Sequence, residues 1–184
     1  ARFERLLDAR RRDLSDDPMP DLAALEDYAD GTSGELSVLA LDLVGVETPA
    51  AHQAARHVGV AWAITGLIRA TPFFARQRRL LLPADLLTSH GVNPLSVFEG
   101  RPEPGLREVL REVARCARSH LDAARQPRAE VPRTALPVLL PARLADRHLA
   151  LLEATDFDVF AGTPTRQAAL TPLRIWWAHA RARY

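Results

Sequence analysis

The stretch GVAWAITGLIRATPFFARQRRLLLP, residues 59–83, decides the fold class of this chain. Apolar residues recur in it every three or four positions, which predicts an α-helix. The proline of Thr71-Pro72 is expected to end or kink this helix, because its ring disfavours helical geometry in the residue before it. Four positions of the helix share one face: Ala63, Gly66, Ala70 and Phe74. None of the four carries a side-chain oxygen, so this face of the helix is expected to be apolar.

The helical spacing continues along almost the whole chain, and no stretch alternates convincingly with a period of two. We therefore predict a single all-α domain over residues 1–184. The expected helices cover residues 2–13, 21–46, 49–70, 104–126, 133–140 and 141–154, with a terminal helix from about residue 165. The helix at 104–126 is amphipathic, with these residues at core spacing: Leu106, Leu110, Val113, Ala117, Leu121 and Ala124.

Composition narrows the class of protein. The 184 residues are 47% hydrophobic and 26% charged, which is ordinary for a globular domain. A net charge of +1 gives no reason to expect nucleic acid as a partner. All 24 basic residues are arginine, which together with 14 prolines suggests a GC-rich bacterial genome. The chain has no run of about 18 apolar residues, so no membrane-spanning helix is predicted. The arginine-rich, helix-like start without methionine suggests the C-terminal portion of a longer protein.

Other catalytic classes lack their motifs. The six histidines form no His-Glu-x-x-His pair and no cluster with carboxylates at ligand spacing, so surface or capping roles are expected. His52 and His57 are predicted to point to different faces of their helix. The single cysteine, Cys116, is expected to pack in the core, and its spacing does not indicate a zinc site. A nucleophile elbow and a phosphate-binding loop are also missing from the sequence.

The central stretch resembles the squalene/phytoene synthase family. The second aspartate-rich helix of that family runs G-x-A-x-Q-x-x-N-x-x-R-D-x-x-x-D, followed by G-R-x-Y-L-P. Residues that match are Gly59, Ala61, Arg69, Arg79, Leu82 and Pro83. The family's glutamine, asparagine and two aspartates fall on Ala63, Gly66, Ala70 and Phe74. The resemblance implies an isoprenoid-synthase-like helical bundle that has lost the ligands for catalytic magnesium, and hence no catalytic residues or cofactor.

The run YADGTSGEL, residues 28–36, has two interpretations. Thr32 and Glu35 form a capping box, which predicts a break at Gly31 and a new helix start. By resemblance, the same run is a family helix on which a tyrosine and small residues let a substrate or neighbouring helix approach closely, and we favour this interpretation. The resemblance then implies a ligand-binding set, in which the arginines meet a diphosphate: Tyr28, Gly31, Gly34, Arg69 and Arg79. A solvated cationic loop or a partner contact explains the arginines of residues 76–79 equally well.

Within the family, four segments resemble the phytoene-synthase-like assembly factors of respiratory complex I. They are Tyr28 with the small residues that follow it, LIRATPFFARQRRLLLP at 67–83, DLLTSHGV at 85–92, and DFDVF at 156–160 before a tryptophan-containing C-terminus that ends in Tyr184. This branch implies a non-enzymatic role in building NADH:ubiquinone oxidoreductase, with complex I subunits or other assembly factors as partners. The expected location is a bacterial cytoplasm, peripheral to the inner membrane, or the matrix side in mitochondria.

Two alternatives stay open. An active head-to-head prenyl-diphosphate synthase would need magnesium ligands from outside residues 59–74, such as Asp30, Glu35 or an upstream segment. An isoprenoid or lipid carrier would use the emptied cavity. We expect Phe74, with Phe73 or Trp62, to plug the former metal end and Arg69 and Arg79 to mark the mouth of any remaining pocket. Paired tryptophans in the terminal helix suit a membrane interface, although core packing is commoner.

Overall fold

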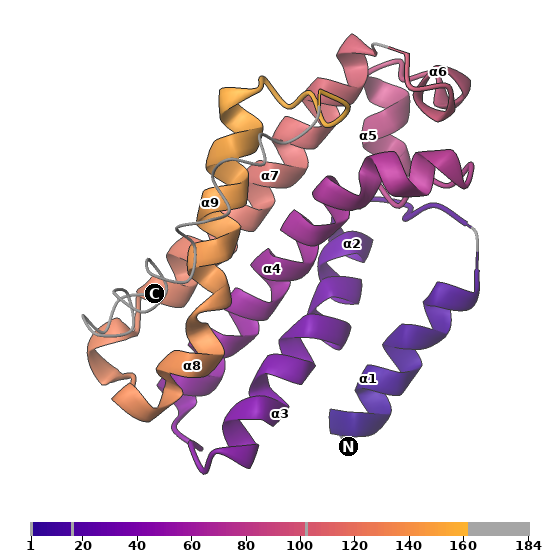
Figure 1. The fold of residues 1–184 in the computed structure, drawn as a ribbon. Coiled ribbons are helices and arrows are strands. Elements are labelled where there is room, and N and C mark those ends of the chain that lie inside the picture. Colours follow the sequence, from indigo (N-terminus) through magenta and orange to yellow (C-terminus); the bar gives the residue numbers. More distant parts are fainter. Residues whose placement is uncertain (1, 16, 102, 162–184) are drawn as a thin grey trace.

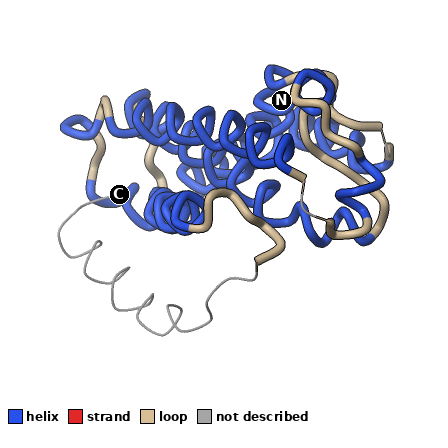
Figure 2. The backbone as a smooth tube through the Cα atoms, turned by 90° about the horizontal axis from the view of Figure 1, so that it is seen from above, coloured by secondary structure: helices blue, strands red, loops and turns tan. Residues whose placement is uncertain are grey.

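The computed structural model describes residues 2–15, 17–101 and 103–161. Over these ranges the chain is blue helix joined by tan loop in Figure 2, and an isolated bridge between Met19 and Pro83 is its sole β-type pairing. The all-α prediction is confirmed. The helices are α1 (Arg2–Arg10), α2 (Leu22–Ala29), α3 (Glu35–Leu43), α4 (Pro49–Arg76), α5 (Ala84–Ser89), α6 (Pro94–Phe98), α7 (Pro104–Arg125), α8 (Leu136–Leu139) and α9 (Pro141–Ala154). The 3₁₀ turns are η1 (Arg11–Leu14), η3 (Arg128–Glu130) and η4 (Arg133–Ala135), and η2 (Asp30–Gly34) is π-helical.

Helix α4 is the centre of the bundle. It lies between α2 and α3 on one side and α7 and α9 on the other (Figure 1). By length and mean hydropathy, 1.4 over an 18-residue window, α4 could cross a membrane, contrary to the expectation that no stretch of the chain is apolar enough to do so. Half of that window is buried against other helices, however, as expected for a core helix that is apolar on most sides.

The helix continues through Pro72, so the predicted end near residue 70 is wrong. Pro72 has no N–H to donate to the backbone of the preceding turn. The Thr71 hydroxyl donates to the carbonyl of Leu67 at 3.2 Å, and Thr71 and Ala75 are buried on either side of the proline. Burial of the last turn therefore outweighs the local cost of the proline.

Helices α2 and α3 form one continuous rod through η2. Asp21 caps α2 by accepting from the Ala24 N–H at 2.8 Å. The capping-box interpretation is wrong, because the backbone stays helical through Gly31 and the Thr32 hydroxyl donates back to the Tyr28 carbonyl at 2.6 Å. The favoured interpretation, a helix with close neighbours, is confirmed. A Cβ on Gly31 would lie 2.8 Å from the Ala9 Cβ of α1.

A close backbone approach joins α4 to η2. A Cβ on Gly59 would lie 2.7 Å from both the carbonyl carbon of Ser33 and the hydroxyl oxygen of Ser37. Real Cβ contacts are longer than this, so glycine is required at this crossing. The backbones of two helices thereby touch directly.

The second half of the chain follows its pattern closely. Helices α7 and α9 lie within one residue of the predicted bounds, and all six predicted core residues of α7 are buried. Residues 133–140 form a 3₁₀ turn and α8 instead of one helix. The DFDVF segment docks on α7, where Arg107 and Arg111 donate to Asp156 at 3.0 and 2.8 Å. The predicted terminal helix and its tryptophans lie outside the described residues.

Two glycines of α4 provide a matched test of this packing. Gly59→Ala should lower the free energy of unfolding by about 1 to 2 kcal/mol, since overpacking against Ser33 exceeds the gain in helix propensity. Gly66→Ala should raise it by about 0.5 to 1 kcal/mol, since a Cβ there meets no atom within 4 Å. Urea unfolding followed by circular dichroism measures both. Equal effects of the two substitutions would contradict the proposed close contact.

Candidate functional site

The α4 face that would carry magnesium ligands in an active family member is apolar. Its four positions are each half-buried: Ala63, Gly66, Ala70 and Phe74. Open space surrounds the position of a Cβ on Gly66, and Ala63 packs against the core cluster. Magnesium requires oxygen ligands, which these side chains do not offer. The residues on this face therefore do not fit the magnesium ions of the family reaction.

A pocket of about 310 Å³ lies at the C-terminal end of this face. It is closed by η1, the loop to α2, and the chain after α4. Its lining residues are Arg10, Arg12, Asp13, Ser15, Asp17, Met19, Tyr28, Leu67, Phe74, Arg79 and Leu81. Three guanidinium groups outnumber two carboxylates in this lining, a balance that suits an anionic or polar group. The apolar side chains suit a hydrocarbon.

Phe74 lies at this pocket, as the plug prediction requires. The Phe73 ring meets it edge-on with centroids 5.6 Å apart, but Phe73 is 58% exposed. Trp62 does not join them, because its ring packs near His148 of α9 at 6.3 Å. The expected contribution of Trp62 to a plug is therefore wrong.

Hydrogen bonds fix the polar wall of the pocket. The Tyr28 hydroxyl donates to Asp13 Oδ1 at 2.6 Å and accepts from Arg10 Nη1 at 3.2 Å. Burial, followed by the hydrogen bond to Asp13, raises the pKa of Tyr28 to about 12, so the phenol stays protonated. Arg79 Nη2 donates to the Ser15 carbonyl at 3.0 Å and so ties the α4–α5 loop to the start of the chain.

The structure brings together only part of the predicted ligand-binding set. Tyr28 and Arg79 line the same pocket, whereas Arg69 is exposed and lies near α9. There, burial and then the charges of Arg69 and Arg147 lower the pKa of His148 to about 4. Gly31 and Gly34 are buried at helix contacts and do not line this pocket. The grouping of Arg69 with Arg79 at one pocket mouth is therefore wrong, because the two lie on different sides of the helix end.

The carboxylates that could have replaced the missing magnesium ligands are held by arginines. Arg56 donates to both oxygens of Asp30, at 2.7 and 2.8 Å, and to Glu35 Oε1 at 2.8 Å. Arg5 of α1 donates to the same two carboxylates, each at 2.7 Å. Burial by itself would raise the pKa of Glu35, but the hydrogen bond and charge of Arg56, with the charges of Arg5 and Arg2, hold that pKa below its usual value. This ion network joins α1, η2, α3 and α4.

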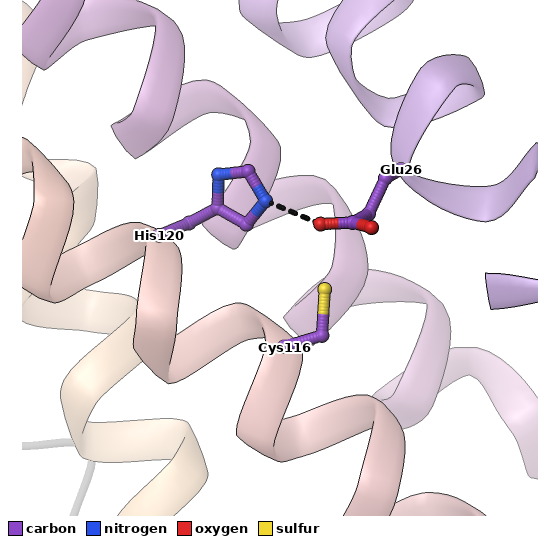
Figure 3. A group of neighbouring side chains, drawn as sticks. All are labelled: Glu26, Cys116 and His120. Carbon is purple, nitrogen blue, oxygen red and sulfur yellow. Dashed lines mark hydrogen bonds and ion pairs between the residues drawn. The ribbon is translucent and has the colours of Figure 1, made fainter. Parts of the chain in front are cut away.

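A second polar group lies between α2 and α7 (Figure 3). Glu26 from α2 faces Cys116 and His120 from α7, and one ligand atom of each lies within 4.8 Å of the others. His120 Nε2 is 2.9 Å from Glu26 Oε1, and His120 Nδ1 is 2.9 Å from His57 Nδ1 of α4. The expectation that no histidine clusters with carboxylates is thus wrong. Cys116 and His120 are four residues apart on one helix, a spacing that could have indicated a shared site. Glu26 is 90 residues before Cys116, and only the packing of α2 brings it to them.

Comparisons with known proteins agree with this geometry. A family model described as squalene/phytoene synthase matches residues 1–174. The chain is 32% identical over 180 residues to a protein from Mus musculus named NADH dehydrogenase (ubiquinone) complex I, assembly factor 6, covering 98% of this chain and 54% of that protein. It is 26% identical over 165 residues to a chloroplastic phytoene synthase from Daucus carota, covering 86% of this chain and 42% of that one.

The fold is also that of a solved enzyme. The crystal structure of a squalene synthase from Alicyclobacillus acidocaldarius superposes with a TM-score of 0.76 at 19% identity, covering 85% of this chain and 60% of that one. At this identity the likeness shows the fold alone. The chain spans about half the length of the curated relatives it matches.

The ion network makes stability depend on pH. Glu35→Gln should lower the free energy of unfolding at pH 7 by about 2 kcal/mol, because Arg5 and Arg56 lose a buried counter-charge but still reach solvent. Since the folded-state pKa of Glu35 lies below its unfolded value, this stabilisation is complete above the unfolded value and lost as pH falls through the folded one. Urea unfolding of both proteins from pH 7 down to pH 3 measures it.

The control is Glu153→Gln, which removes an exposed ion pair with Arg118 and should change stability little. A difference between wild type and Glu35→Gln that stays constant over this pH range would show that the charge of Glu35 is not what stabilises the contact.

Proposed function

The chain belongs to the squalene/phytoene synthase family, and from this premise we propose that it is a catalytically inactive member that acts in the assembly of respiratory complex I. The observation that carries the proposal is the α4 face, where the family pattern survives around four positions that have lost their oxygen ligands. Packing against the neighbouring helices holds α4 in place, whereas the oxygen ligands that the family reaction needs are missing from this face.

The charge requirements of the family reaction support the loss of activity. Ionisation of an allylic diphosphate leaves negative charge on the departing group, and metal ions supply its main stabilisation. Ala70 and Phe74 cannot hold such an ion. Asp30 and Glu35, the nearby carboxylates of η2 and α3, are already neutralised by Arg5 and Arg56. An active synthase would have to take its ligands from elsewhere in the protein.

The relatives support the assembly role. A protein named complex I assembly factor 6 is 32% identical to this chain along 98% of its length, whereas the phytoene synthase is 26% identical along 86%. We therefore infer that the partners are complex I subunits or other assembly factors. The protein would act at the inner membrane, on its cytoplasmic side in a bacterium or on its matrix side in a mitochondrion. The arginine-rich composition favours a bacterium, although the assembly-factor relatives given above come from a eukaryote.

One observation favours a second candidate, an isoprenoid or lipid carrier. The pocket between Tyr28, Phe74 and Arg79 joins apolar walls to guanidinium groups, which is the pairing that a hydrocarbon with an anionic head would need. This candidate is compatible with an assembly role, since binding a lipid requires no catalytic reaction.

Deletion of the gene tests the assembly role. Membranes from the deletion strain should lose most NADH-dependent respiration and keep succinate-dependent respiration, because succinate enters the chain after complex I. The gene returned in wild-type form, or with Gly66→Ala as a substitution that the packing tolerates, should restore the NADH-dependent rate. Equal loss of both activities, or loss of neither, would count against the proposal.

An assay of prenyl transfer tests the loss of catalysis separately. Purified full-length protein with magnesium and either farnesyl or geranylgeranyl diphosphate should give no condensation product by mass spectrometry, because the α4 face holds no ion. An active squalene synthase serves as the positive control. Turnover approaching that control would identify the protein as an enzyme and locate its ligands elsewhere.

A further inference from the structure

The convergence of Glu26, Cys116 and His120 between α2 and α7 leads us to propose a binding site for a transition-metal ion, with Zn²⁺ as the best fit. The group is separate from the α4 face of Ala63 and Phe74 and uses none of the residues that match the family's magnesium helix. Its ligands would be Glu26 Oε, Cys116 Sγ and His120 Nε2 (Figure 3).

The helical framework already aims these three atoms at one point. Cys116 and His120 are four residues apart, so their side chains leave the same face of α7, and both point toward Glu26 in Figure 3. The atoms lie within 4.8 Å of one another, and the shortest separation is 2.9 Å, between Glu26 and His120. Zinc bonds of about 2.0 to 2.3 Å in a tetrahedron place ligand atoms about 3.3 to 3.7 Å apart. Side-chain rotations that move the ligand atoms by about 1 Å reach that geometry.

The donor set is one that zinc prefers. A thiolate, an imidazole and a carboxylate are its three protein ligand types, whereas magnesium and calcium take oxygen alone. Two anionic ligands would also balance the charge of a divalent ion in this half-buried place. Neutral His120 would donate its Nε2 lone pair to the ion, at the place where Nε2 now lies 2.9 Å from Glu26 Oε1.

Without metal, the thiol has no reason to ionise. Burial, followed by the hydrogen bond to Glu26 and its charge, raises the pKa of Cys116 to about 12. A bound divalent cation reverses this balance, because it is the largest charge in the site and deprotonates a coordinating thiol. Binding at neutral pH should therefore release the Cys116 proton, which makes metal affinity rise with pH.

His57 acts as a positioning residue. Its Nδ1 lies 2.9 Å from His120 Nδ1, on the side of the imidazole away from Glu26. A proton held on His120 Nδ1 and donated to His57 leaves Nε2 free for the ion, which is the role that outer partners of zinc-binding histidines usually play. The site is thus supported from a third helix, α4.

One coordination position stays open to water. The side chains of Glu26 and His120 are 39% and 17% exposed, whereas Cys116 is 9% exposed, so solvent reaches the group at the carboxylate and imidazole more than at the sulfur. A water molecule completes the tetrahedron from that side. The ion would join α2 to α7 across the bundle.

Cobalt substitution tests the site directly. Full-length protein, stripped of metal by chelation and freed of any affinity tag, is titrated with Co²⁺ and then with Zn²⁺ as competitor. We expect one ion per chain, a thiolate-to-cobalt charge-transfer band with intense tetrahedral ligand-field bands, and loss of both on adding zinc. Zinc should also raise the melting temperature, since a ligand bound only by the folded state stabilises it.

Variants separate the proposed ligands from their surroundings. Cys116→Ser should abolish the charge-transfer band, Glu26→Gln should weaken binding at least tenfold, and His57→Ala should weaken it about 10- to 100-fold while keeping every ligand. His90→Gln is the matched control, because it removes a histidine that is paired with a carboxylate, Glu112, at 2.7 Å but is not one of the three proposed ligands, and it should leave affinity unchanged.

Three results would overturn the proposal: no ion bound by the wild type, a band that survives Cys116→Ser, or equal loss of binding in His90→Gln. Far-ultraviolet circular dichroism checks the fold of each variant. Should Cys116→Ser lose helicity, the band in the wild type together with the affinity of His57→Ala decides the matter.

Discussion

The contact between Gly59 of α4 and the backbone of Ser33 is the constraint on which the rest of the structure depends. It brings two helices together with no side chain between them, a separation that only glycine allows. The same contact places Arg56, one turn before Gly59, beside Asp30 and Glu35. Those carboxylates in turn bind Arg5, so the position of α1 follows from the crossing of α4 and η2.

This arrangement explains how a family fold persists without the family's ligands. The residues that set the bundle lie on the buried faces of α4, from Ala51 and Ala55 to Ile64 and Ile68. The face with Ala63, Gly66, Ala70 and Phe74 is half-buried and contributes little close packing, as the open space at Gly66 illustrates. Substitutions on that face remove metal ligands at little cost in stability. Loss of catalysis and retention of fold are therefore physically compatible.

The remaining polar chemistry is distributed around α4. Ion pairs hold α1 and η2 on one side, Tyr28 and Arg79 line a pocket at its end, and Glu26, Cys116 and His120 meet beside it. The assembly role proposed above would require such surfaces and small binding sites more than one solvated catalytic cavity. The structure has the former in its described part and lacks the ligands of the latter on α4.

Periodicity in the sequence determined the all-α class, the bounds of α7 and α9 and the core face of α7, because these depend on neighbours three and four residues apart. The missing oxygen ligands on α4 were inferred from the resemblance of residues 59–83 to the squalene/phytoene synthase family. Only the tertiary structure decided whether α4 passes Pro72, where burial of Thr71 and Ala75 outweighs a local penalty. It also turned Glu35 from a capping residue into the partner of Arg56, separated Arg69 from Arg79, and brought Glu26 to Cys116 and His120. Each of these depends on contacts between helices distant in sequence, which local spacing does not encode.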